Sequence, residues 1–407
     1  MLQKLISKNI YLIALALFVL SAFLGLLIRW SFVFPSALIS YKNFVQGHSH
    51  VAFLGWGYLA VFGLILHTFV PKYTWNNTFK ISIIIAVISI FLMLFSFPFS
   101  GYKAFSIVLL VVFGISSYIL SFNILKHLNG SDTSTKLIRF SIYYYLISSL
   151  ATWFLVFVII KFGKSDLYYN TIYFYLHFLY NGFFVFALFG LLFKVFENQK
   201  IKISEKYKKL FFMYLNVACI PAYALSILWS NVSTFFYVLG FAAAVLQLIS
   251  LLFLFKIMQQ AFLNLKWNIL SKVLLKFLII AYSLKIISQL FSAFPYFVQK
   301  SIALKPFFII GYLHLFTLAF MSVFIVLVLS ELNKIFFTNN SSKFGLFTFL
   351  AGIILTEFLL FGQGFLILAK LKPISNHNAL LLICSVILFL GIFLLFISQL
   401  FKQKATL

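Results

Sequence analysis

The chain has 407 residues, of which 64% are hydrophobic, 21% are aromatic and only 9% are charged. A soluble domain of this size could not bury so much apolar surface in a core, so the composition excludes a soluble protein and requires contact with lipid. The basic excess, 31 Lys and Arg against 6 Asp and Glu, does not indicate nucleic-acid binding, because the basic residues lie in short loops between apolar segments. The expected surroundings are therefore the lipid bilayer, with no nucleic-acid partner.

About twelve apolar segments are long enough to cross a bilayer. In chain order the predicted spans are 10–30, 50–70, 79–97, 104–125, 140–160, 171–194, 210–229, 234–255, 272–292, 307–330, 344–369 and 378–401. The first follows Lys4 and Lys8 like a signal peptide, but it lacks a small-x-small cleavage site and is long enough to span, so we expect a retained helix. Pro221 is expected to kink the seventh segment. The sequence thus predicts an all-α polytopic integral membrane protein.

The basic residues predict how these spans are oriented. With the N-terminus in the cytoplasm, the cytoplasmic segments hold 21 of the 31 basic residues and the outer segments hold 9, while Lys285 lies within a span. This bias predicts that both termini are cytoplasmic, in the inner (plasma) membrane of a bacterium. The longest polar stretch, residues 197–209, is a basic cytoplasmic loop. It would divide a single transmembrane domain into two six-helix halves, residues 1–196 and 210–407.

Five of the seven histidines fall at one depth in this topology, the outer third of the membrane: His48, His50, His177, His314 and His377. The other two, His67 and His127, lie toward the cytoplasm. A buried imidazole in apolar sequence needs a hydrogen bond or a metal. Parallel helices that present imidazoles at matched depth can clamp one haem iron from both faces. The alternative is that each histidine caps a helix or bonds a neighbouring side chain.

Three segments resemble the catalytic subunit of haem-copper oxidases, nearest to C-type oxidases and nitric oxide reductases. They are HSHVAFLGW (48–56), YLHFLYNGFFVFALFG (175–190) and GYLHLFTLAF (311–320). The resemblance implies a bundle like oxidase subunit I, in which His48 and His314 are the axial ligands of a low-spin haem b. The H-x-H helix opening and the twelve-helix layout are also similar to NnrS-type haem and copper membrane proteins linked to nitric oxide stress. Because the chain has no CxxCH, any haem is expected to be non-covalent.

The same resemblance gives roles to further residues. His50 replaces a polar residue of the family beside the cofactor, Tyr312 stands where the family places the high-spin haem ligand, and His177 matches a copper-ligating histidine. Arg29, at the outer end of the first span, is expected either to neutralise a haem propionate or to reach the lipid headgroups. The family's adjacent histidine pair is absent from segment 210–229. His177 is therefore expected to be at most a remnant copper or second haem site, and copper itself is not expected.

These features predict a membrane-bound b-type haem protein for electron transfer or for chemistry on a small gas, nitric oxide or oxygen. If it is an enzyme, the resemblance implies an oxidoreductase, supplied by an electron donor or another respiratory-chain partner. Two alternatives stay open. One is a non-haem polytopic transporter or lipid-handling protein, in which Lys285 and Glu357, at similar predicted depth, line a polar path or form an ion pair. The other is a non-catalytic respiratory assembly partner.

Overall fold

The computed structural model describes residues 2–36 and 39–404, and within those ranges every regular element is a helix. Eleven of the described helices are long and apolar enough to cross a membrane. A twelfth span is present if the bent pair Glu205–Cys219 and Pro221–Ser230 is counted as one. The prediction of an all-α polytopic membrane protein is confirmed.

Most spans are single helices. They are α1 (Leu2–Val33), α4 (Asn77–Ser100), α5 (Ala104–His127), α6 (Thr133–Phe162), α11 (Thr234–Asn264), α12 (Ile269–Phe291), α16 (Asn340–Leu368) and α17 (His377–Lys404). Local signals set where several begin, because an Asn or Asp side chain accepts a hydrogen bond from a backbone N–H of the first turn. The capping residues are Asn76, Asp132, Asn268 and Asn339.

The span formed by α9 (Glu205–Cys219), η4 (Pro221–Tyr223), α10 (Ala224–Ile227) and η5 (Leu228–Ser230) is bent by 49°. The bend lies at Pro221, as predicted, because proline lacks an N–H and its ring clashes with the preceding turn. Two shorter helices lie in connections, namely η2 (Lys72–Thr74) and α13 (Pro295–Ala303).

Three spans share one design that differs from the rest. Each begins with an α-helix that ends at a histidine, continues as a π-helix and returns to an α-helix. They are α2 (Tyr41–His50), η1 (Val51–Tyr58) and α3 (Leu59–Phe69); α7 (Asp166–His177), η3 (Phe178–Phe184) and α8 (Val185–Asn198); and α14 (Lys305–His314), η6 (Leu315–Ser322) and α15 (Val323–Glu331). In these spans 72–89% of the most apolar window is buried, against 22–56% in the eight spans that are single helices. Because π-helical turns frequently mark functional sites, the three most buried spans are where a site is expected.

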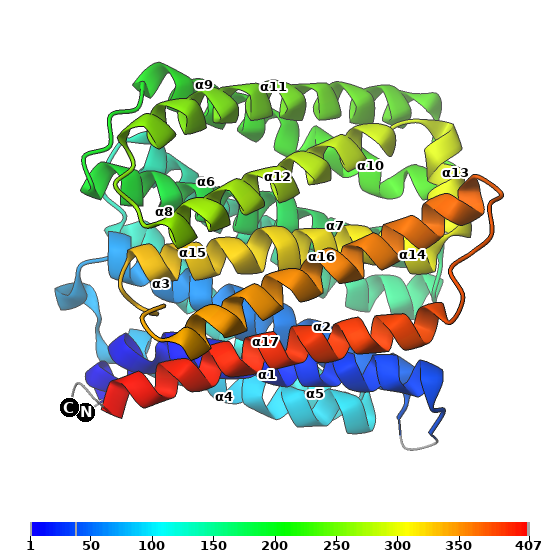
Figure 1. Ribbon diagram of the computed structural model, residues 1–407, viewed down its shortest axis with the longest axis horizontal. Coiled ribbons are helices and arrows are strands. Elements are labelled where there is room, and N and C mark those ends of the chain that lie inside the picture. Colours follow the sequence, from blue (N-terminus) through cyan, green and yellow to red (C-terminus); the bar gives the residue numbers. More distant parts are fainter. Residues whose placement is uncertain (1, 37–38, 405–407) are drawn as a thin grey trace. The chain divides into compact units, whose positions relative to one another are not determined.

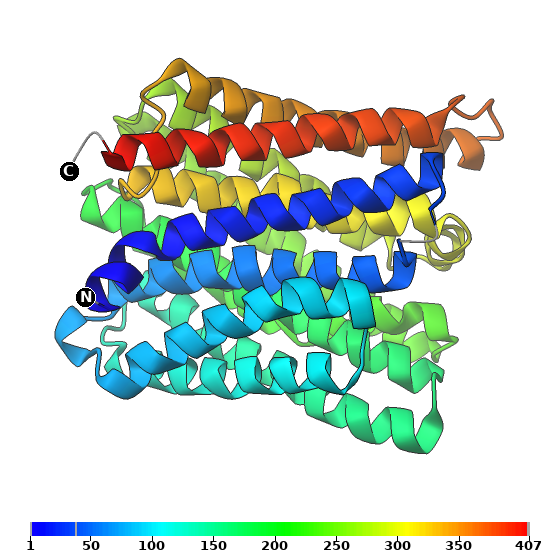
Figure 2. The same ribbon diagram turned by 90° about the horizontal axis from the view of Figure 1, so that it is seen from below.

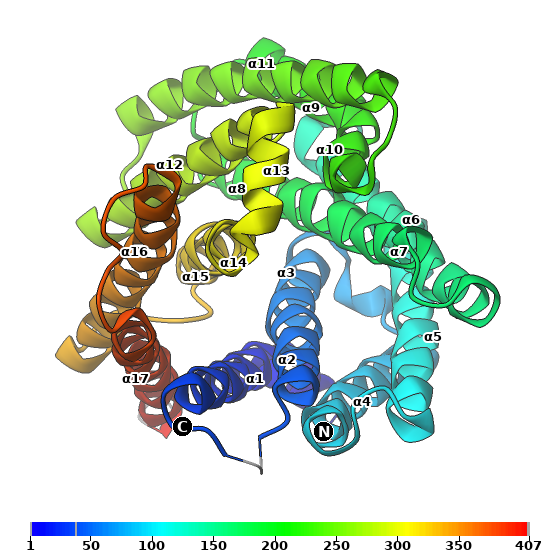
Figure 3. The same cartoon turned by 90° about the vertical axis from the view of Figure 1, so that its right-hand side faces the viewer.

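The helices form two compact units. Unit 1 comprises Met1–His127 and Leu329–Leu407, and unit 2 comprises Leu128–Val328. This division differs from the predicted halves, since unit 1 takes helices from both ends of the chain. Within unit 1, α1 runs beside α17 (Figure 2) and also packs against the α2–η1–α3 span, which contacts α4 on another side (Figure 3). In unit 2, α6 packs along the α7–η3–α8 span, α9 lies beside α11, and α12 packs against η6 (Figure 1).

Glycines bring α16 and α17 of unit 1 into backbone contact (Figure 1). A Cβ atom at Gly352 would lie 3.0 Å from the backbone nitrogen of Leu388, and one at Gly391 would overlap the backbone nitrogen of Phe349. Small residues at such crossings allow close van der Waals packing, which is a principal source of helix association in a membrane.

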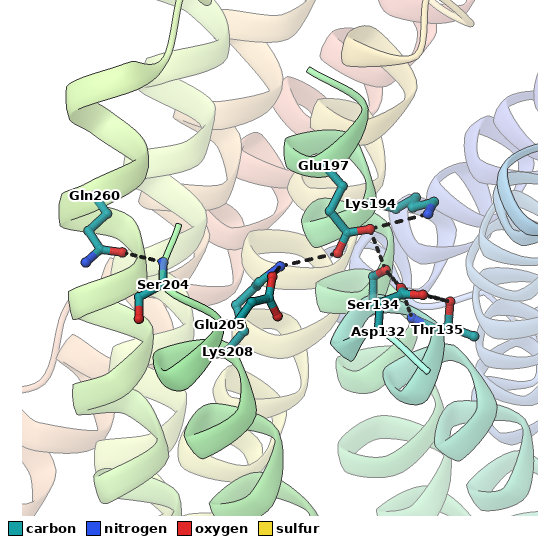
Figure 4. Close-up of polar contacts among 9 residues, drawn as sticks. All are labelled: Asp132, Ser134, Thr135, Lys194, Glu197, Ser204, Glu205, Lys208 and Gln260. Atoms are coloured by element: carbon teal, nitrogen blue, oxygen red, sulfur yellow. Dashed lines mark hydrogen bonds and ion pairs between the residues drawn. The ribbon is translucent and has the colours of Figure 1, made fainter. Parts of the chain in front are cut away.

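A polar network joins the ends of α6, α8 and α9 in unit 2 (Figure 4). Asp132 accepts a hydrogen bond from the Thr135 backbone N–H at 3.0 Å and another from the Ser134 hydroxyl. The same Ser134 oxygen lies 2.9 Å from Oε2 of Glu197, whose Oε1 is 3.4 Å from Nζ of Lys208. These contacts hold the start of α6 and the α8–α9 connection together.

We expect Gly391→Ala to lower the midpoint temperature of unfolding, because the added methyl group would overlap the Phe349 backbone and push α16 and α17 apart. Overpacking of this kind costs about 1–3 kcal/mol. Thermal unfolding of the purified protein in detergent measures the change. The matched control is Gly114→Ala in α5, where nothing lies within 4 Å of the added atom. Equal losses in both variants would contradict the prediction.

The N-cap of α6 makes stability depend on pH. Burial raises the pKa of Asp132, but hydrogen bonds from Ser134 and Thr135 outweigh it and hold the pKa below its ordinary value. The folded-state pKa is thus below the unfolded-state pKa, so the stabilisation is present above the unfolded value and is lost as pH falls through the folded value. Asp132→Ala should cost about 1 kcal/mol at neutral pH.

Asp132→Asn is the matched variant for this effect, because it keeps the capping oxygen and removes the charge. It should cost less than Asp132→Ala and should lose part of the acid dependence of unfolding. Unfolding temperatures measured from neutral to acidic pH test both statements. A constant gap between the wild type and Asp132→Asn at every pH would show that the carboxylate charge has no role.

Candidate functional site

His48 lies just before the π-helix of unit 1, and α1 frames its ring. Nδ1 of His48 is 2.8 Å from the Ser21 carbonyl oxygen. Because a carbonyl can only accept, Nδ1 carries the proton and Nε2 is the basic nitrogen. No described residue forms a hydrogen bond with Nε2. A backbone carbonyl on one ring nitrogen is the usual support of a histidine that binds a metal through the other.

The absence of a side chain at Gly25 leaves the space that the His48 ring occupies. A Cβ atom at Gly25 would lie 3.0 Å from Cε1 and 3.2 Å from Nδ1 of His48. Ser21, Gly25 and Arg29 follow at intervals of four along α1, so they share one face of that helix. Arg29 forms none of the ion pairs found among the described residues. This face therefore offers an acceptor for Nδ1, room for the ring and, one turn further on, a guanidinium suited to a carboxylate.

His50 is used differently, although it is only two residues away. Its Nε2 lies 2.7 Å from the hydroxyl oxygen of Tyr102, in the connection between α4 and α5, and its ring packs on Phe97 with centroids 4.5 Å apart. His48 contacts α1 and His50 contacts the α4 side of unit 1. The structure therefore does not bring His50 into the His48 arrangement, and its predicted role beside a cofactor stays a prediction.

His177 of unit 2 is part of a buried string of hydrogen bonds. Its Nε2 lies 2.8 Å from the Cys219 carbonyl oxygen, and its Nδ1 lies 3.3 Å from Nδ2 of Asn181 on η3. Oδ1 of Asn181 accepts from Nζ of Lys285 on α12. The Cys219 carbonyl is open to the ring because α9 ends there, next to Pro221.

The string has one direction. Lys285 donates to Asn181, Asn181 donates to His177, and His177 donates to the Cys219 carbonyl, so each bond polarises the next. Lys285 is only 2% exposed. The acidic residues of unit 2 all lie at helix ends and leave it without a counter-charge in the membrane: Asp132, Asp166, Glu197 and Glu205.

Both ring nitrogens of His177 are therefore engaged by the protein. A metal ion at His177 would have to displace either the Cys219 carbonyl or the Asn181 amide. In the part of the chain that the structure describes, no three His, Cys, Asp or Glu residues come together as metal ligands. The remnant copper or second haem site at His177 stays a prediction.

His314 and Tyr312 lie on α14 of unit 2, whereas His48, His50 and Arg29 belong to unit 1. Nδ1 of His314 is 2.9 Å from the carbonyl oxygen of Ile310, one turn earlier. By the same argument as for His48, Nδ1 carries the proton and Nε2 is basic. The side chains of Tyr312 and His314 are both partly buried.

The α–π–α arrangement that the three buried spans share was not predicted from the sequence, although a pattern of ionisable residues accompanies it there. When the segments are aligned on the histidine that precedes each π-helix, an ionisable residue stands 17 positions later in every case: 50 to 67, 177 to 194 and 314 to 331. The residues at the later positions are His67, Lys194 and Glu331. In unit 1 this position forms a further contact, since Nε2 of His67 lies 2.6 Å from Nζ of Lys334.

No protein-family model matches the chain, and no curated protein matches it. Two arrangements carry the functional argument. One is the His48 imidazole, oriented by α1 with its basic nitrogen available. The other is the string of hydrogen bonds that ends at the buried Lys285 amine.

Asn181→Leu tests the string, because it leaves the Lys285 amine buried without its partner. A buried polar group left unsatisfied costs about 1–3 kcal/mol. Adding Lys285→Met should recover most of that loss, since both partners are then apolar. Unfolding temperatures of the wild type, both single variants and the double variant give the coupling energy. Asn123→Leu with Lys285→Met is the control pair and should be additive; additivity in the Asn181 cycle as well would contradict the assignment.

Proposed function

We propose that the protein is a membrane-bound haem b protein in which His48 is an axial ligand of the iron. The observation that supports this is the state of the His48 ring. Its Nδ1–H is held by the Ser21 carbonyl, Gly25 leaves room for the ring, and no described residue hydrogen-bonds Nε2. An imidazole oriented in this way through Nδ1 is suited to bind iron through Nε2.

The residues present suit a haem better than a bare metal ion. A metal ion held by protein alone needs three or four ligands, and the described residues contain no such group. A haem brings four nitrogen ligands of its own and needs only one or two from the protein. Arg29, one turn beyond Gly25, would neutralise a propionate. Attachment would be non-covalent, since the only cysteines, Cys219 and Cys384, are not in a CxxCH motif.

His314 is the second axial ligand that the resemblance to haem-copper oxidases implies, and Tyr312 is the residue it implies for a second haem. Within unit 2, the Ile310 carbonyl holds Nδ1 of His314 as the Ser21 carbonyl holds Nδ1 of His48. When bound, a haem b supplies one-electron transfer or a site for nitric oxide or oxygen. The protein's own part is to orient the imidazoles and to balance the propionate charge.

The excess of basic residues in the predicted cytoplasmic segments supports a location in a bacterial inner membrane, with both termini in the cytoplasm. A respiratory-chain protein or another electron donor would then be the partner. Copper has no part in the proposal, because both ring nitrogens of His177 have protein partners.

We expect the purified full-length protein to show a Soret band and the reduced-minus-oxidised spectrum of a b-type haem, with iron in the metal analysis. His48→Ala should lose or shift that spectrum. Gly25→Leu should do the same without changing the ligand itself, because the new side chain fills the space of the His48 ring. Arg29→Gln should lower the midpoint potential, since a positive charge near the haem favours its reduced form.

His127→Ala is the matched control. The Nδ1 of His127 also lies near a backbone carbonyl, that of Asn123 at 2.9 Å, but the residue ends α5 on the predicted cytoplasmic side. Its spectrum should equal that of the wild type. A folded wild-type protein that shows no Soret band, even after haemin is added, excludes the proposal. A spectrum unchanged in His48→Ala removes His48 from it.

A further inference from the structure

Glu357 is the one acidic residue of the described chain that lies in the middle of a span. The other five lie within two residues of a helix end: Asp132, Asp166, Glu197, Glu205 and Glu331. Glu357 is on α16 of unit 1, at the boundary between two faces of that helix. One neighbouring face is buried and apolar, with Ile353 and Leu360, and the other is exposed, with Ile354 and Phe358.

The carboxyl group of Glu357 has no partner. Both of its oxygens are buried, and neither forms a hydrogen bond with any described residue. None of the ion pairs in that part of the chain includes it. An ionised carboxylate held in this way in hydrocarbon is costly, and a neutral carboxylic acid costs far less.

The titratable groups on the helices that pack against α16 do not supply a partner. On α17, Nε2 of His377 lies 3.1 Å from the Leu359 carbonyl oxygen, and Cys384 is a buried free thiol. On α1, which reaches α16 through its aromatic side chains, the Tyr11 hydroxyl donates to the carbonyl oxygen of Gly63. The α1 guanidinium of Arg29 forms no ion pair with Glu357.

We propose that Glu357 is a proton-binding site inside the membrane, whose carboxyl group holds a proton at neutral pH. The ligand is a proton rather than a metal cation, because Ca²⁺ takes about six to eight oxygen ligands and Mg²⁺ about six. No described donor hydrogen-bonds the Glu357 carboxyl group, and no three His, Cys, Asp or Glu of the described residues come together as ligands of a metal ion. The proposal does not depend on haem binding.

A lipophilic carbodiimide tests this on the full-length protein in detergent or liposomes. The reagent adds across its C=N bond only to a protonated carboxyl group, and the adduct rearranges to a stable N-acylurea that carries the whole mass of the reagent. An ordinary exposed carboxyl group, with a pKa of about 4, is protonated in roughly one molecule in 1,000 at neutral pH. We therefore expect mass spectrometry to find the adduct at Glu357, and not at the acids of the helix ends.

Glu357→Gln should abolish this adduct, and Glu331→Gln, at the end of α15, should leave it unchanged. Infrared spectroscopy gives an answer that does not depend on access of the reagent. The protonated carboxyl group should give a C=O band above the amide band that shifts in D₂O and disappears only in Glu357→Gln. A wild-type spectrum without that band at neutral pH overturns the proposal, whatever the labelling shows. The haem spectrum is measured separately, so failure of one proposal does not affect the other.

Discussion

The cost of leaving a polar group without a partner in hydrocarbon governs this structure. Helices satisfy most of the backbone, and the remaining polar side chains bond to carbonyl oxygens that the helices leave accessible. Three histidines illustrate this, because each has one ring nitrogen against a backbone carbonyl: His48 against Ser21, His177 against Cys219 and His314 against Ile310. Each contact fixes which nitrogen carries the proton, and so it decides which chemistry the ring can perform.

Local irregularities make these carbonyls available. In α1, the residue whose N–H bonds to the Ser21 carbonyl is Gly25, and its missing Cβ opens that carbonyl to the His48 ring. In unit 2, the break at Pro221 frees the Cys219 carbonyl for His177. The two rings differ in the second nitrogen. In His177 this nitrogen is hydrogen-bonded to Asn181, whereas in His48 no described residue forms a hydrogen bond with it.

Much of the fold follows from the sequence, because a membrane span is specified by apolar length alone. Prediction of the spans and of the kink at Pro221 required only the positions of residues along the chain. The hydrogen-bond partners of the site residues could not be predicted from positions along the chain. Their similar predicted depths in the membrane suggested that Lys285 and Glu357 form a pair. A contact also depends on how each helix is rotated about its axis, and packing decides that rotation. Within unit 2 it directs the Lys285 amine to Asn181. The π-helices could not be predicted either, because hydropathy indicates the length of an apolar segment and not which backbone groups are hydrogen-bonded within it.

Lys285 and Glu357, the two mid-span ionisable groups without a described counter-ion in their own units, matter for the proposed redox role. Adding an electron to a cofactor in a medium of low dielectric is unfavourable unless a positive charge accompanies it. In this chain one lysine and one acid lie at mid-span, each without a counter-ion among the described residues of its own unit. The neutral amine of a lysine becomes charged when it gains one proton, and the neutral acid of a glutamate becomes charged when it loses one. If the proposed haem is bound, an electron added to it would need a compensating positive charge, and Lys285 of unit 2 and Glu357 of unit 1 are the mid-span groups that can gain or lose a proton.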